Sequence, residues 1–130
     1  MDRIATTLWA AIVLLAAILG IEARCARADD EPVTVIVRFY PTAGREDELL
    51  TRLTRLRDYV NANVPGVTYR LYRARSEPTM FLLYETFPSQ TAVEEMAKTV
   101  FPAFQKQAGP IPQGIVTRPV EPERFTELRP

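Results

Sequence analysis

Apolar residues recur along the chain with two different periods, and these periods predict which stretches form strands and which form helices. Residues 33–40 (VTVIVRFY) are rich in β-branched and aromatic side chains, which is typical of a strand. In residues 45–64 the apolar positions follow in steps of four, three and four, so they lie on one face of a helix. These positions are Leu49, Leu53, Leu56 and Val60. The proline and glycine within residues 64–66 predict the end of this helix.

A hairpin is predicted next. Residues 67–74 (VTYRLYRA) and 79–87 (TMFLLYETF) each have the composition of a strand. The four residues RSEP between them predict a short turn, so the two strands are expected to pair.

The last third of the chain predicts a second helical region and a fourth strand. Residues 88–109 have helical character, with Thr91 and Glu94 at the spacing of a capping box. Pro102 is expected to divide this region, because proline lacks the amide hydrogen that a helix interior uses. Residues 114–120 (GIVTRPV) predict the fourth strand, which should be short or at an edge because a proline interrupts it.

The predicted order β-α-β-β-α-β is that of the α+β, ferredoxin-like fold, in which two helices cover one face of a four-stranded antiparallel sheet. The first and third predicted strands are apolar on both of their faces. In the first strand Val33, Val35, Val37 and Phe39 share one face, and Ile36 and Tyr40 lie on the other. In the third strand Phe81 and Leu83 lie opposite Met80, Leu82 and Tyr84. A sheet with one face in water alternates more cleanly. We therefore expect a homodimer, in which the sheet of a second subunit covers the face without helices.

The N-terminal stretch has the pattern of a secretory signal peptide. A short positive start precedes the uncharged apolar run of residues 8–21, and residues 26–28 (ARA) then offer a small-x-small cleavage site. Cleavage after Ala28 would leave residues 29–130 as one domain in the periplasm or outside the cell. The alternative is an uncleaved membrane anchor, because residues 4–21 just reach spanning length.

Composition excludes several classes of site. Residues 1–28 hold three of the 16 basic and two of the 16 acidic residues, which leaves 13 and 14 in the rest of the chain. No basic excess is present for a nucleic-acid partner. The chain has no His, and its one cysteine, Cys25, lies in the signal segment. Common zinc sites, Cys nucleophiles, Ser-His triads and haem held by a His are therefore excluded, and we expect neither metal nor cofactor.

The helix predicted in residues 45–64 carries acidic residues in its first turn and arginines later, which suits its dipole. Glu48 and Arg52 are spaced to form an i,i+4 ion pair. We interpret these charges as a solvated face.

Three segments together resemble the antibiotic biosynthesis monooxygenase family: PTAGREDELL, VPGVTYRLYRA and FLLYETFPSQTAVEEM. The resemblance covers about residues 33–120. It implies a dimeric α/β barrel and a family of cofactor-independent oxygenases of quinol-like aromatics, haem-degrading enzymes and proteins of other function. The chain departs from the family at two places. Phe87 stands where the family often has Trp, and no His is present in the region of Met96, so haem degradation is disfavoured.

Under this resemblance the candidate catalytic residues are Glu85 as the base, with Tyr72 and Tyr84 as proton relays. The candidate substrate-binding residues are Tyr69, Arg70, Arg73, Asn61, Asn63, Phe87 and Met96. Among these, the asparagines and arginines would stabilise an oxyanion.

Each candidate also has a structural interpretation. Glu85 is an unusual carboxylate in an apolar strand, and a buried charge needs a partner, for which Arg70 or Arg73 is expected. The tyrosines fit a core, and Asn61 and Asn63 fit the turn after a helix. Three functions therefore remain open: an exported monooxygenase of a small phenol or quinol, a protein that binds such a molecule without turnover, and a dimeric assembly unit.

Overall fold

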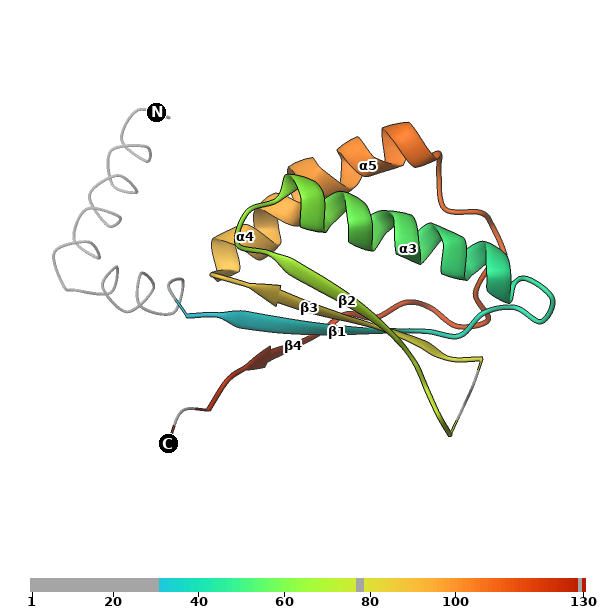
Figure 1. Cartoon of the computed structure of the whole chain (residues 1–130), viewed down its shortest axis with the longest axis horizontal. Coiled ribbons are helices and arrows are strands. Elements are labelled where there is room, and N and C mark those ends of the chain that lie inside the picture. The colour runs from blue at the N-terminus through green and yellow to red at the C-terminus, as the bar shows by residue number, and fades with distance from the viewer. Residues whose placement is uncertain (1–30, 77–78, 129) are drawn as a thin grey trace, which may run out of the picture.

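The computed structural model describes residues 31–76, 79–128 and 130. The predicted signal peptide and its cleavage site lie outside these residues. Figure 1 shows a sheet covered on one side by helices, with the other side bare. The strands follow the order β2-β3-β1-β4, with all neighbours antiparallel. This is the ferredoxin-like fold that the sequence predicts.

Strand β1 (Val33–Phe39) and helix α3 (Glu46–Asn63) form where they are expected. Gly44 has a φ of +83° in the turn between them, a conformation that side chains disfavour. All four periodic apolar residues of α3 are buried: Leu49, Leu53, Leu56 and Val60. The helix ends at Asn63, directly before the predicted proline-glycine break.

The predicted Glu48–Arg52 pair is wrong. Glu48 instead accepts two hydrogen bonds from Arg45, at 2.8 Å from Nε and 2.9 Å from Nη2. Arg52 donates to the carbonyl oxygens of Ala108 and Gly109 at the end of the last helix, at 3.4 and 2.8 Å. The cause is competition: Arg45 presents two parallel donors to the same carboxylate, an arrangement that fits its geometry.

Strands β2 (Thr68–Arg73) and β3 (Phe81–Phe87) pair antiparallel, which confirms the predicted hairpin. The backbone N–H of Ala74 donates to the Met80 carbonyl at the end of the ladder. Strand β3 is one of the two inner strands, because β2 pairs with one of its edges and β1 with the other; β1, between β3 and β4, is the second.

The second helical region consists of three pieces: α4 (Gln90–Glu95), the π-helix η1 (Met96–Val100) and α5 (Phe101–Ala108). The predicted capping box at Thr91 is wrong by two residues, since Ser89 is the N-cap and its Oγ accepts from the Ala92 amide. Division near Pro102 is confirmed. Proline cannot donate to the carbonyl four residues back and clashes with it, and the wider π turn lies directly before it.

The predicted fourth strand is misplaced. Strand β4 comprises Glu123–Thr126 and pairs with β1, whereas residues 114–120 contribute only an isolated bridge between Val116 and Pro41. Ile115 is instead buried against Leu49, Leu53 and Phe81 on the helical side of the sheet. The apolar character of residues 114–120 therefore reflects packing into the core. A polar stretch forms β4, because its ladder partner is the free backbone edge of β1.

Candidate functional site

A cavity of about 220 Å³ lies between the helical side of the sheet and three other elements: α3, α5 and residues 110–122. Its walls are almost entirely aliphatic and aromatic. The sheet contributes Val37, Phe39 and Leu83, and the helices contribute Leu49, Leu53, Leu56, Phe101 and Phe104. Its polar lining residues are Glu85, Tyr69 and Arg52. A concave, mainly apolar space with a few polar groups is the usual form of a small-molecule site.

Glu85 lies on the wall that the sheet forms. Residues of β3 alternate between the two faces of the sheet, so Glu85 shares the helical side with Phe81, Leu83 and Phe87. Only 8% of its surface is exposed, and it is the one buried charged residue in the part of the chain that the structure describes. Burial in apolar surroundings raises the pKa of Glu85 to about 7, because removing water disfavours the charged form.

The partner of Glu85 is Tyr69. The two residues are opposite each other in the β2–β3 ladder, where side chains on one face come within contact distance. The Tyr69 hydroxyl donates to the carboxyl group, and this hydrogen bond partly opposes the rise in the pKa of Glu85. Burial and the nearby Glu85 carboxylate both raise the pKa of Tyr69, so the phenol keeps its proton.

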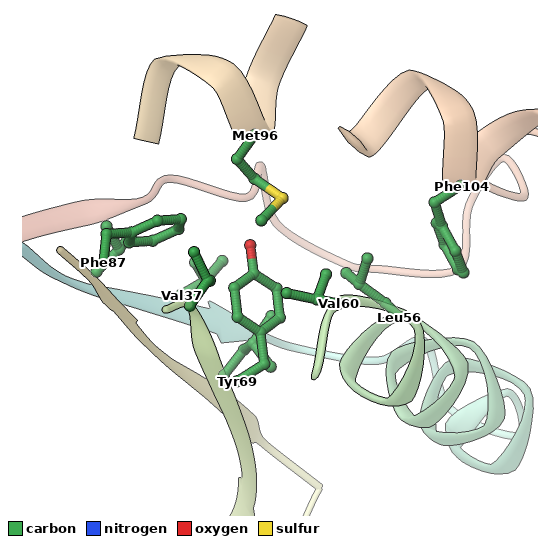
Figure 2. Packing of buried hydrophobic residues seen from close by; sticks show 10 residues of the cluster. Val37, Leu56, Val60, Tyr69, Phe87, Met96 and Phe104 are labelled. Atoms are coloured by element: carbon green, nitrogen blue, oxygen red, sulfur yellow. The ribbon is translucent and has the colours of Figure 1, made fainter. Parts of the chain in front are cut away.

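Tyr69 is fixed at both its backbone and its ring. Its amide donates to Asn61 Oδ1 at 2.8 Å, and its carbonyl accepts from Asn61 Nδ2 at 2.9 Å. Its ring contacts Phe87 edge to face, with 6.1 Å between centroids. Figure 2 shows the ring rising from β2 between Val37 and Val60, with the hydroxyl on the side of Met96. Asn61, Phe87 and Met96 therefore surround Tyr69, although they are not lining residues of the cavity.

The expected arginine partner of Glu85 is absent, which corrects the prediction that Arg70 or Arg73 neutralises it. Arg70 is exposed on the other face of the sheet, where it is opposite Tyr84. Arg73 is also exposed at the end of β2, with its guanidinium 5.3 Å from the centre of the Phe81 ring. Both side chains stay in water, which is the state that costs a lone cation least. Glu85 is thus paired with a neutral phenol.

The sheet separates the three candidate catalytic residues. Tyr84 is next to Glu85 in β3 and therefore points to the opposite face, and Tyr72 is opposite Leu82 on that same face. Tyr84 lines a shallow groove of about 530 Å³ there, together with Ile36 and Phe125. Among the substrate-binding candidates, Asn63 lies apart from the cavity and donates to the Tyr59 carbonyl at 2.8 Å in the last turn of α3.

Sequence reasoning missed several residues of this site. Arg52 contributes to one wall, and its guanidinium lies 5.8 Å from the centre of the Phe104 ring. Phe101, Phe104 and the apolar residues of 110–122 complete the lining. The apolar spacing of Phe101 and Phe104 in a helical region was the one available signal. The contribution of residues 110–122 depends on a chain path that no local pattern indicates.

The described residues contain neither a candidate metal site nor a candidate membrane-spanning helix. No group of three or more His, Cys, Asp or Glu side chains is placed to hold a metal ion in residues 31–76 and 79–128. In the same residues, no helix is both long and apolar enough to cross a membrane.

The arrangement can bind a flat apolar molecule and exchange one proton with it. A carboxyl group with a pKa near 7 is a base or an acid at neutral pH, and the apolar walls exclude water from the reacting atoms.

Comparison with known proteins agrees with this fold. The family described as antibiotic biosynthesis monooxygenase matches residues 32–107. Among solved structures, Rv0793 from Mycobacterium tuberculosis is 26% identical, with a TM-score of 0.61; the match covers 76% of this chain and 97% of that one. PA3566 from Pseudomonas aeruginosa is 20% identical, with a TM-score of 0.61 and coverages of 76% and 96%.

A third similar structure has a described activity. A variant of SnoaB, a cofactor-independent oxygenase from Streptomyces nogalater, is 19% identical, with a TM-score of 0.58 and coverages of 77% and 96%. At this identity the likeness shows the fold alone. No match was found among curated proteins.

Proposed function

Because the chain belongs to the antibiotic biosynthesis monooxygenase family, we propose that it is a cofactor-independent monooxygenase of small phenolic or quinol-like compounds. The observation that carries this proposal is the buried Glu85 carboxyl group on the wall of an apolar cavity, hydrogen-bonded to Tyr69. Glu85 is the proposed base. Tyr69, and not Tyr72 or Tyr84, is the proposed residue that orients the carboxyl group, since it alone of the three shares the face of Glu85.

The proposed reaction acts on the keto tautomer of the phenol or quinol and converts its activated ring CH2 group to a ketone. Glu85 removes one proton, and the resulting anion transfers an electron to dioxygen. The substrate radical and superoxide combine to a peroxide, which takes the proton back from Glu85 and loses water as the C=O bond forms. One atom of dioxygen enters the ketone and the other leaves as water, so four electrons pass from carbon to oxygen. The protein supplies the base, its orientation and a dry site.

Oxygen consumption with a panel of hydroquinones, naphthohydroquinones and anthrones tests this proposal, with autoxidation measured without protein. Glu85→Gln should lower kcat at least about 100-fold, as expected for loss of a general base. Tyr69→Phe should lower kcat less and shift the pH profile, because it removes the hydrogen bond to the base. Tyr72→Phe is the matched control, on the opposite face of the sheet, and should retain wild-type kcat.

Two results would contradict the enzyme proposal. The first is that the Glu85→Gln variant consumes oxygen at the wild-type rate. The second is that the rate of oxygen consumption with wild-type protein never exceeds the rate of autoxidation.

Binding without turnover is the second candidate, and the nearly uniform apolar lining favours it. Native mass spectrometry of residues 29–130 discriminates the two functions. A reproducible small-molecule adduct together with no oxygen uptake would support a binding protein, whereas uptake that requires Glu85 would support the enzyme.

We also propose that a second copy of this chain covers the bare face of the sheet. Ile36, Leu82 and Tyr84 are only half-buried there, and Phe125 is 43% exposed. Family membership favours a dimer. Light scattering after gel filtration should give the mass of a dimer for the wild type and of a monomer for Ile36→Glu. Leu128→Glu, on the exposed tail, should remain dimeric. A monomeric wild type at micromolar concentration would contradict the proposal.

Export after cleavage at Ala28 also remains a proposal. N-terminal sequencing of protein recovered from the periplasm should begin at residue 29. A start at Met1 in the membrane fraction would support the anchor instead.

A further inference from the structure

We infer that residues 110–122 determine which ligands the cavity accepts, and that Ile111 and Val120 are the specificity-determining side chains. The inference rests on the proposed function only in taking this cavity as the ligand site. It does not require turnover.

Residues 110–122 form one complete wall of the cavity. Ile111, Ile115, Val116, Val120 and Pro122 all line it. The match to the family ends at residue 107, so the opposite walls, from the sheet and α3, belong to the matched region and this wall does not. This wall therefore lies in a part of the chain that the family pattern does not constrain.

The middle of this wall is held in place by several hydrogen bonds to the turn that follows β1. The Thr42 amide donates to the Ile115 carbonyl at 2.9 Å. The Thr117 amide donates to the Tyr40 carbonyl at 2.8 Å, and Arg45 Nη1 donates to the Gln113 carbonyl at 2.8 Å. Ile115, between these contacts, is 1% exposed. The centre of the wall is thus part of the core and leaves little room for adjustment.

The ends of the wall differ from its centre. Ile111 is 52% exposed and Val120 is 39% exposed, although both line the cavity. Side chains that contact both the cavity and the solvent mark its mouth. Because they are largely exposed, they can change in size at little cost to packing.

The volume of the cavity indicates what must reach this mouth. A dry protein cavity of about 150 Å³ holds benzene. A cavity of about 220 Å³ therefore accommodates a fused two-ring system, and a third ring has to extend between Ile111 and Val120. The geometry thus indicates that Ile111 and Val120 discriminate between two-ring and three-ring ligands. In both cases the polar group of the ligand is directed at Glu85.

Binding of 2-naphthol and 2-hydroxyanthracene, which differ by one ring, tests the inference. Both are fluorescent, so their dissociation constants can be measured by anisotropy, under nitrogen to prevent turnover. Val120→Phe and Ile111→Phe should each raise the dissociation constant of 2-hydroxyanthracene at least tenfold. They should change the dissociation constant of 2-naphthol less than twofold. Val120→Ala should instead increase the preference for 2-hydroxyanthracene over 2-naphthol threefold or more. Leu128→Phe is the control, at a 92% exposed site that is not a lining residue of the cavity, and should leave both constants unchanged.

The outcomes separate this inference from the proposed function. Ring-size selectivity that changes as stated, in a protein that consumes no oxygen, supports the inference and overturns the enzyme proposal. Equal effects on both ligands in every mouth variant, or no saturable binding of either ligand by the wild type, would overturn the inference. Near-wild-type melting temperatures and circular dichroism spectra establish that the variants are folded.

Discussion

The two faces of the sheet are built from the same strands, and both contain large apolar side chains, yet they differ in what covers them. On the helical face, Val35, Val37, Leu83 and Phe87 are each at most 5% exposed. On the other face, the neighbouring positions Ile36, Leu82 and Tyr84 remain half-buried within the single chain. Figure 1 shows the cause, since α3, α4 and α5 lie on one side of the sheet.

This difference teaches where chemistry can be placed in a small domain. The helical face has enough cover to exclude water from Glu85, and this burial is what brings the pKa of that carboxyl group to about 7. A carboxylate on the bare face, such as Glu123, is exposed and forms a salt bridge with Arg38. The following predictions test this contrast.

The largest effect is expected from truncating one leucine on each face. Leu83→Ala should lower the free energy of unfolding by about 2–5 kcal/mol, because Leu83 is 1% exposed and its truncation removes buried contacts and enlarges the cavity that it lines. Leu82→Ala, one residue away, should cost clearly less when both changes are made in the monomeric Ile36→Glu protein, because Leu82 is half-buried in the single chain. Urea denaturation measures both. Equal losses would show that the two faces are covered alike in solution.

Stability should depend on pH through Glu85. Its pKa is raised from 4.5 to about 7 on folding, so the folded state favours the protonated form. The associated stability is fully present below about pH 4.5 and is lost as the pH rises to about 7. The total loss is about 3 kcal/mol. Glu85→Gln should remove this part of the pH dependence and be more stable than the wild type at pH 8. A flat wild-type profile from pH 5 to 7 would contradict the raised pKa of Glu85.

A smaller effect is expected from the side chain that holds Tyr69 on the helical face. Asn61→Ala removes both hydrogen bonds to the Tyr69 backbone and should destabilise the protein by about 1–3 kcal/mol. Asn63→Ala removes a single hydrogen bond at the exposed end of α3 and should cost less. Thermal unfolding of the pair gives the comparison. An Asn61→Ala protein as stable as Asn63→Ala would mean that β2 positions Tyr69 without this contact.

The fold was predictable from sequence wherever one periodicity dominated. Helix α3 and strands β1 to β3 lie within one or two residues of the predicted ranges, because their apolar positions repeat regularly. The fourth strand was not predictable in this way. Its partner is a free backbone edge, which does not require apolar side chains, whereas Ile115 and Val116 line a cavity and pack in the core.

The candidate site was predictable in one residue and obscured in its neighbours. Glu85 stands out as a carboxylate in an apolar strand. The alternation of strand residues already separates Glu85 from Tyr84, so this part of the signal was present in the sequence. The pairing with Tyr69 depends on the register between β2 and β3, and the outer wall depends on how residues 110–122 return across the fold. Both features depend on the tertiary structure, which no local sequence pattern indicates.

The π-helix Met96–Val100 has a consequence for how this protein can diverge. A π turn carries one residue more than an α-helical turn in the same length, so a single-codon deletion within it would restore a continuous α-helix. With α4 fixed by its Ser89 cap, such a deletion would leave the later side chains in nearly their present orientation, because the wider turn accommodates the extra residue. Phe101 and Phe104 would still face the cavity. The π turn is therefore a place where the chain can lose a residue without reshaping the site, and relatives without the π turn should show a one-residue gap at this position.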